Sequence, residues 1–213
     1  HYVSEIMSVE KEGPYALAGF SLGGKIAYEM ARQLHERGKV VSFLGMIDTV
    51  ADNPAERKSF SYAMNYFSWN VKTLFKSEAD ENSIESLKRK MKGLKRKVVG
   101  MDLNVLQEEK QSMGKSSELP GYLKEVHRAN RKADREYVIK TYKGEVHLFK
   151  AKNQTFYIKD TMTYGWDKYA QGGVVIHEIP GEHSSIFAPP NDKYFADVLQ
   201  RHLSMIHEES PVS

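Results

Sequence analysis

Cysteine is missing from this chain of 213 residues. Its absence excludes a disulfide framework, a zinc site built on thiolates and a cysteine nucleophile. A chain without cysteine fits a reducing compartment, so we expect a cytoplasmic protein. Spacings typical of metal ligands and a glycine-rich loop for phosphate are also missing, and we therefore expect neither a metal site nor a bound cofactor.

Long hydrophobic runs are missing as well. No stretch of about 18 apolar residues occurs, so we expect no membrane span and no membrane partner. The chain starts at His1, without a basic start followed by an apolar core. It therefore lacks the pattern of a signal peptide, and we expect it to be cut from a longer polypeptide.

The composition that is present suits one globular domain, with 40% hydrophobic and 28% charged residues. Its formal net charge is +3, but the charges are unevenly distributed along the chain, because residues 54–132 carry 17 Lys and Arg against 10 Asp and Glu. A basic segment of this kind favours an acidic partner, although a solvated helical face is the simpler interpretation. The stretch KRKMKGLKRK (88–97) has no interleaved aromatic residue, so we expect no nucleic-acid partner.

The hydrophobic pattern predicts an α/β fold. An apolar run at 15–20, a helical pattern at 25–37 and a second apolar run at 40–47 form a strand–helix–strand unit. Further elements are expected as a helix end at 2–10, strands at 144–151 and 173–179, and a last helix at 191–206. Between them, the charged and helix-like segment at about 54–132 predicts a helical lid insertion.

One serine lies in a pattern that carries chemistry. Gly19-Phe-Ser21-Leu-Gly23 is a G-x-S-x-G motif between the first strand and its helix. In such a sharp turn, small neighbours allow a strained backbone that lifts the serine hydroxyl out of the sheet. The turn also directs the N–H of Leu22 to the place where an oxyanion would form.

A serine nucleophile needs a base and an acid. His183 follows the last predicted strand, in a loop that we expect Pro180 and Gly181 to open, and it is the candidate base. The other seven histidines fall on predicted helices or strands or at the chain end, where a structural role is expected. Asp48 and Asp160 both follow strands, and the order Ser–Asp–His fits either, so the residues alone do not choose between them.

The motifs together identify a family. GPYALAGFSLGGKIAYEMARQL with LGMIDT, and later YKGEVHLFKA with GWDKYAQGGVVIHEIPGEHSSIF, resemble the thioesterase domains that end nonribosomal peptide synthetases and polyketide synthases. Those domains are α/β-hydrolases. The resemblance implies that Ser21 is the nucleophile, His183 the base and Asp48 the acid. In free-standing editing thioesterases the acid follows the later strand, which corresponds to Asp160.

The resemblance also implies the reaction. A member of this family would release an acyl or peptidyl chain, by hydrolysis or cyclisation, from the phosphopantetheine of a carrier protein in the same polypeptide. Tyr66, Phe67 and Trp69 would line an acyl pocket or pack within the lid. The alternatives are a carboxylesterase or lipase, a free-standing editing thioesterase, and an inactive binding module.

One departure from the family pattern concerns the N-terminus. Family members have several strands before the nucleophile strand, and a loop after one of them supplies a second oxyanion donor. Only 20 residues precede Ser21. We therefore expect residues 1–213 to be a single, N-terminally truncated domain in which Leu22 N–H is the one oxyanion donor.

Overall fold

The computed structural model describes residues 1–57, 59–76 and 120–209. The chain divides into two compact units, one formed by residues 1–52 with 139–213 and the other by 53–138. The second unit nearly coincides with the insertion expected at 54–132. The basic stretch at 88–97 lies outside the described residues.

The first unit is built on a parallel sheet of four strands in the order β1-β2-β3-β4. The strands predicted from the hydrophobic pattern are all present, with ends that differ by a few residues. The elements are α1 (Tyr2–Val9), β1 (Tyr15–Phe20), α2 (Leu22–Glu36), β2 (Val41–Ile47), β3 (Val146–Asn153), the short 3-10 helix η1 (Trp166–Lys168), β4 (Val174–Glu182) and α8 (Asn191–Glu209).

The end of β4 differs from the expectation. The strand continues through Pro180 and Gly181 to Glu182, so the loop predicted to open at these residues is wrong. β4 is an edge strand of the described sheet, where a proline that donates no hydrogen bond is tolerated. His183 therefore follows directly on a strand rather than a loop.

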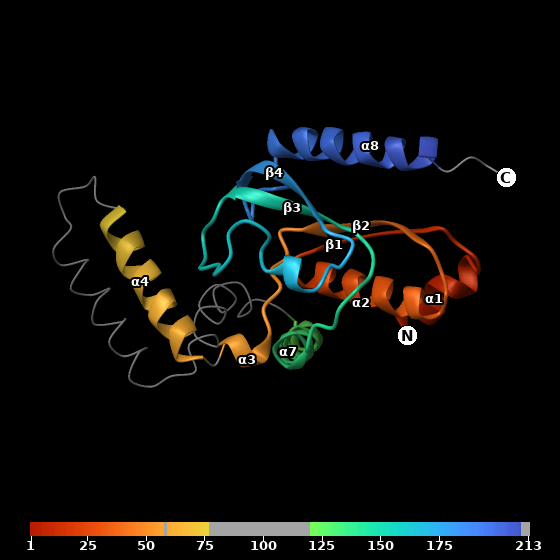
Figure 1. Cartoon of the computed structure of the whole chain (residues 1–213). Helices are drawn as coiled ribbons and strands as arrows, with labels where there is room; N and C mark the ends of the chain where they lie inside the picture. Colours follow the sequence, from red (N-terminus) through yellow and green to blue (C-terminus); the bar gives the residue numbers. More distant parts are fainter. Residues whose placement is uncertain (58, 77–119, 210–213) are drawn as a thin grey trace. The chain divides into compact units, whose positions relative to one another are not determined.

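Helices cover both faces of the sheet, with α8 on one side and α1 and α2 on the other (Figure 1). The apolar side of α2 repeats at helical spacing through Ala27, Ala31 and Leu34, all of which are buried. On the opposite face, side chains of β2, β3 and β4 pack against α8. This cluster consists of Phe43, Ile47, Phe149, Ala151, Ile179, Ile186, Phe195 and Val198.

The second unit contains α3 (Pro54–Arg57), α4 (Phe60–Lys76) and α7 (Gly121–Glu136). α4 lies within the segment at about 54–132 that the sequence predicts to be helical. On it Tyr66 is buried, Trp69 is half-buried and Phe67 is exposed. None of the helices in the described part of the chain is long and apolar enough to cross a membrane.

Candidate active site

Ser21 occupies a strained turn between β1 and α2. Its φ of 54° and ψ of −121° lie where a serine backbone is rarely found, at a cost of roughly 1–3 kcal/mol. The surrounding structure holds it there: Ser21 N–H donates to Ile47 O at 2.9 Å, and Ser21 O accepts from Gly24 N–H and from Thr49 Oγ1, each at 3.0 Å. Hydrogen bonds to the end of β2 and to the first turn of α2 thus keep the backbone of Ser21 in this strained conformation.

The glycines around Ser21 are not equivalent. A Cβ on Gly19 would lie 2.1 Å from the carbonyl oxygen of Gly23, and one on Gly24 would lie 2.1 Å from Thr49 Oγ1. A Cβ on Gly23 would meet nothing within 4 Å. The close approach of strand and helix therefore requires Gly19 and Gly24, and the small size expected to matter at Gly23 is not needed for space.

This difference gives a stability prediction. Gly24→Ala should lower the free energy of unfolding by about 1–3 kcal/mol, because its methyl group would overlap the Thr49 side chain. The matched control Gly23→Ala, at a helical position with open space, should leave it unchanged or raise it by up to about 1 kcal/mol. Urea unfolding measures both, and equal losses in the two variants would contradict the steric interpretation.

The carboxylate of Asp48 contacts the imidazole of His183. Asp48 Oδ2 lies 2.6 Å from His183 Nδ1, and the Asp48 side chain is only 2% exposed. Its other oxygen, Oδ1, accepts from Ala151 N–H at 2.8 Å and from the Tyr164 hydroxyl at 3.2 Å. Each oxygen thus has a partner, which compensates for the removal of the charge from water.

The imidazole of His183 lies beside the serine turn. Its ring stacks on Phe20, the residue before Ser21, with centroids 4.5 Å apart, and meets the ring of Phe156 edge-on at 5.6 Å. With Nδ1 facing Asp48, Nε2 is the nitrogen left to exchange a proton with a substrate or nucleophile. The Ser21 hydroxyl makes no hydrogen bond within the described residues. A hydrogen bond between a nucleophile and its base is often long or poorly aligned in a chain without substrate.

Asp160 has a different environment. Its carboxylate accepts hydrogen bonds from Met162 N–H, Gly165 N–H, and both the N–H and the hydroxyl of Thr163. Burial opposes ionisation, but these hydrogen bonds outweigh it, so the pKa of Asp160 lies below its usual value. Asp160 closes the turn before η1, and the structure brings Asp48, not Asp160, to His183.

The remaining predicted residues fall in two places. Leu22 is the first residue of α2, and its N–H makes no hydrogen bond among the described residues, as an oxyanion donor requires. Tyr66, Phe67 and Trp69 belong to α4 of the second unit.

Three supporting groups were not identified from the sequence. Thr49 Oγ1 bridges the carbonyl oxygens of Ser21 and Ile47, and Trp166 Nε1 donates to Thr49 O at 2.7 Å. The Tyr164 hydroxyl donates to Asp48. Thr49 could have been found from the sequence, because it directly follows the candidate acid Asp48. Tyr164 lies 116 positions from Asp48, and no pattern in the sequence connects the two residues.

The chain matches known proteins over most of its length. The family described as Thioesterase domain matches residues 1–203. A non-reducing polyketide synthase of Cladonia grayi is 29% identical over 200 residues, which cover 89% of this chain and 9% of that protein. A dimodular nonribosomal peptide synthase of Bacillus subtilis is 24% identical over 196 residues, or 88% of this chain and 8% of that protein. The chain thus spans less than a tenth of the length of these relatives.

Solved structures show the same fold. SrfTE, the thioesterase domain that cyclises the lipopeptide antibiotic surfactin, has a TM-score of 0.54 at 19% identity, over 95% of this chain and 72% of that one. Human thioesterase 2 has a TM-score of 0.53 at 16% identity, over 100% of this chain and 81% of that one. At such identities the likeness shows the fold alone, an α/β-hydrolase-like parallel sheet with helices.

Proposed function

The chain belongs to the thioesterase domain family, and from that premise we propose that it releases an acyl or peptidyl chain from the phosphopantetheine thioester of a carrier protein, through an acyl-enzyme on Ser21. The observation that carries this proposal is the hydrogen bond of 2.6 Å between Asp48 and His183, beside the strained turn of Ser21. A buried carboxylate paired with an imidazole is the arrangement that makes a nearby hydroxyl nucleophilic.

In the first step Ser21 Oγ attacks the thioester carbonyl carbon, and His183 Nε2 takes the hydroxyl proton. Asp48 stabilises the resulting imidazolium through the proton on Nδ1. The negative charge that develops on the carbonyl oxygen is bound by Leu22 N–H at the positive end of α2. The carbon–sulfur bond then breaks, and the pantetheine thiol leaves with the proton from His183.

In the second step an acceptor attacks the Ser21 ester while His183 acts as base again. Water gives a free acid, and an amine or hydroxyl within the acyl chain gives a ring. Ser21 Oγ recovers its proton from His183, so the protein returns to its starting state. The contact with Asp48 rather than Asp160 favours a domain integrated with its carrier protein over the free-standing editing type. No cofactor is required, since the pantetheine arm arrives with the substrate.

The flanking aromatic residues have a role in this proposal. Phe20 and Phe156 hold the His183 ring between them and restrict its rotation. Phe67 and Trp69 on α4 supply apolar surface for the acyl chain, whereas the side chain of Tyr66 is buried. A carrier protein with an acidic surface is the partner that fits the basic stretch at 88–97.

A comparison of a thioester with an oxygen ester of the same acyl group tests the proposal. S-octanoyl-pantetheine should be cleaved with a kcat/KM roughly tenfold or more above that of 4-nitrophenyl octanoate, because contacts with the pantetheine arm lower the barrier for the thioester alone. Octanoyl-loaded carrier protein should be a better substrate still. Rates are measured by thiol release and nitrophenol absorbance, after subtraction of the background of the Ser21→Ala variant. Cleavage of the oxygen ester alone would indicate a carboxylesterase instead.

A further inference from the structure

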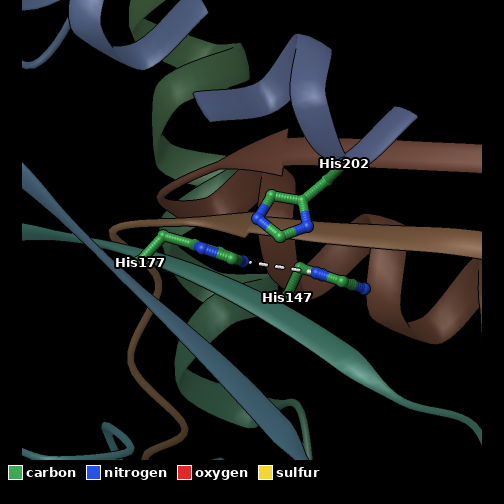
Figure 2. Close-up of side chains that lie close together, drawn as sticks. All are labelled: His147, His177 and His202. Atoms are coloured by element: carbon green, nitrogen blue, oxygen red, sulfur yellow. Dashed lines mark hydrogen bonds between the residues drawn. The ribbon is translucent and has the colours of Figure 1, made fainter. Parts of the chain in front are cut away.

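Outside the candidate active site, three histidines meet between the sheet and the last helix. His147 comes from β3, His177 from β4 and His202 from α8, and Figure 2 shows their rings converging from these three elements. His202 follows Val198 by one helical turn, on the side of α8 that packs on the sheet. The three imidazoles therefore share one space although they are far apart in the sequence.

The ring nitrogens have the spacing of metal ligands. One nitrogen from each ring lies within 4.8 Å of the other two. His147 Nδ1 and His177 Nε2 are 3.3 Å apart. Two imidazole nitrogens bound to one tetrahedral Zn²⁺ at 2.0–2.1 Å are expected about 3.4 Å apart, which matches that pair.

Glu145 fixes the proton of His147 on the side away from the other two rings. Its Oε1 lies 3.1 Å from His147 Nε2 and accepts a hydrogen bond from it. The lone pair of the ring is then on Nδ1, which accepts a hydrogen bond from His177 Nε2 in the metal-free chain (Figure 2); a metal ion bound to both nitrogens would take the place of this proton, and His177 would carry its proton on Nδ1. A carboxylate behind a histidine in this way is the usual support of a metal-binding imidazole.

The other two rings are also suited to bind a metal. His202 contacts both, with ring centroids 4.2 Å from His177 and 5.4 Å from His147, and makes no hydrogen bond within the described part of the chain. Burial lowers the pKa of His147, and burial together with the two neighbouring rings lowers the pKa of His177 to about 4. A lower pKa favours the neutral imidazole, which is the form that binds a metal ion.

We propose that His147, His177 and His202 bind one Zn²⁺ ion, with a water molecule as the fourth ligand, and that the ion ties α8 to β3 and β4. Imidazole nitrogen is a preferred ligand of Zn²⁺. The ion would lie away from the Ser21–His183 site, because His147 precedes Ala151, which contacts Asp48, by four strand positions, or roughly 13 Å. This differs from the sequence-based expectation that the chain has no metal site, since the three ligands have no recognisable spacing.

Calorimetric titration with ZnCl₂ tests the site on the full chain, purified without a histidine tag and freed of metal by a chelator. The wild type should bind Zn²⁺ at 1:1, and its Tm should rise by several degrees. His202→Gln should weaken Zn²⁺ binding by at least about tenfold, and Glu145→Gln by about tenfold through its effect on His147. The matched control His35→Gln, which removes an exposed histidine on α2, should bind like the wild type.

Co²⁺ gives a second measurement that needs no variant. The wild type should show the visible absorption bands of tetrahedral Co²⁺, and these should disappear when one equivalent of Zn²⁺ is added. The proposal is overturned if the wild type binds no Zn²⁺ at 1:1, or if the folded His202→Gln variant binds it as tightly as the wild type. The three rings would then be only a packed aromatic cluster beneath α8.

Discussion

Replacing Ser21 with alanine should lower the turnover of acyl-pantetheine by roughly 10⁴- to 10⁶-fold, the range found when a member of a catalytic triad is removed. The variant lacks the oxygen that forms the acyl-enzyme, so His183 and Asp48 are left without a nucleophile to activate. The fold should be kept, because Ser21 is held through its backbone N–H and carbonyl oxygen rather than through its hydroxyl. Single-turnover kinetics measures the loss.

Covalent labelling provides the direct test of Ser21. A fluorophosphonate probe should add one phosphonyl group to the wild type, located on Ser21 by peptide mass spectrometry, and should add none to Ser21→Ala. The matched control is Ser184→Ala, which removes an exposed hydroxyl next to His183 and should leave labelling intact. Labelling that persists in Ser21→Ala would assign the nucleophile elsewhere, and a wild type that takes no label would indicate an inactive binding module.

Asp48→Asn has the second largest expected effect, a fall in kcat of about 10⁴-fold. The amide is nearly isosteric, and its oxygen can still accept from Ala151 N–H and the Tyr164 hydroxyl. Its NH₂ group, however, would face His183 Nδ1, which favours the wrong tautomer of the imidazole and removes the charge that stabilises the imidazolium. Steady-state kinetics, together with circular dichroism to verify the fold, separates this loss from unfolding.

Asp160→Asn is the matched control for the acid. Its turnover should stay within about threefold of the wild type, because the Asp160 carboxylate binds the turn at 162–165 and not His183. If Asp160→Asn lost activity while Asp48→Asn kept it, the assignment of the acid would be reversed and the free-standing editing type would be favoured.

The Asp160→Asn variant should instead have a lower Tm than the wild type, and the size of this difference should depend on pH. The pKa of Asp160 is lower in the folded chain than its usual value, because hydrogen bonds to the ionised carboxylate outweigh the effect of burial. Its contribution to stability is therefore present above the unfolded pKa and is lost as the pH falls through the folded pKa. The difference in Tm between wild type and Asp160→Asn should accordingly shrink as the pH is lowered.

Local patterns in the sequence determined the elements and the candidate residues. The apolar run at 15–20, the G-x-S-x-G turn and the amphipathic helix after it predict the β1–α2 unit, because these signals come from neighbours within a few positions. The same kind of signal located His183 and two possible acids at strand ends. It also predicted that β4 ends at 179, since proline and glycine usually end a strand, and this was wrong because β4 is an edge strand.

Tertiary structure decided what the local patterns left open. Which aspartate meets His183 depends on how the end of β2 lies against β3 and β4, and no pattern in the chain encodes that distance. The sequence also does not show that position 24 requires glycine while position 23 does not, because that requirement comes from the Thr49 side chain, just after β2. Nor does it show that His147, His177 and His202 meet beneath α8. Local order follows from short-range sterics and hydrophobic periodicity, whereas contacts between residues a hundred positions apart exist only once strand register and helix packing are fixed.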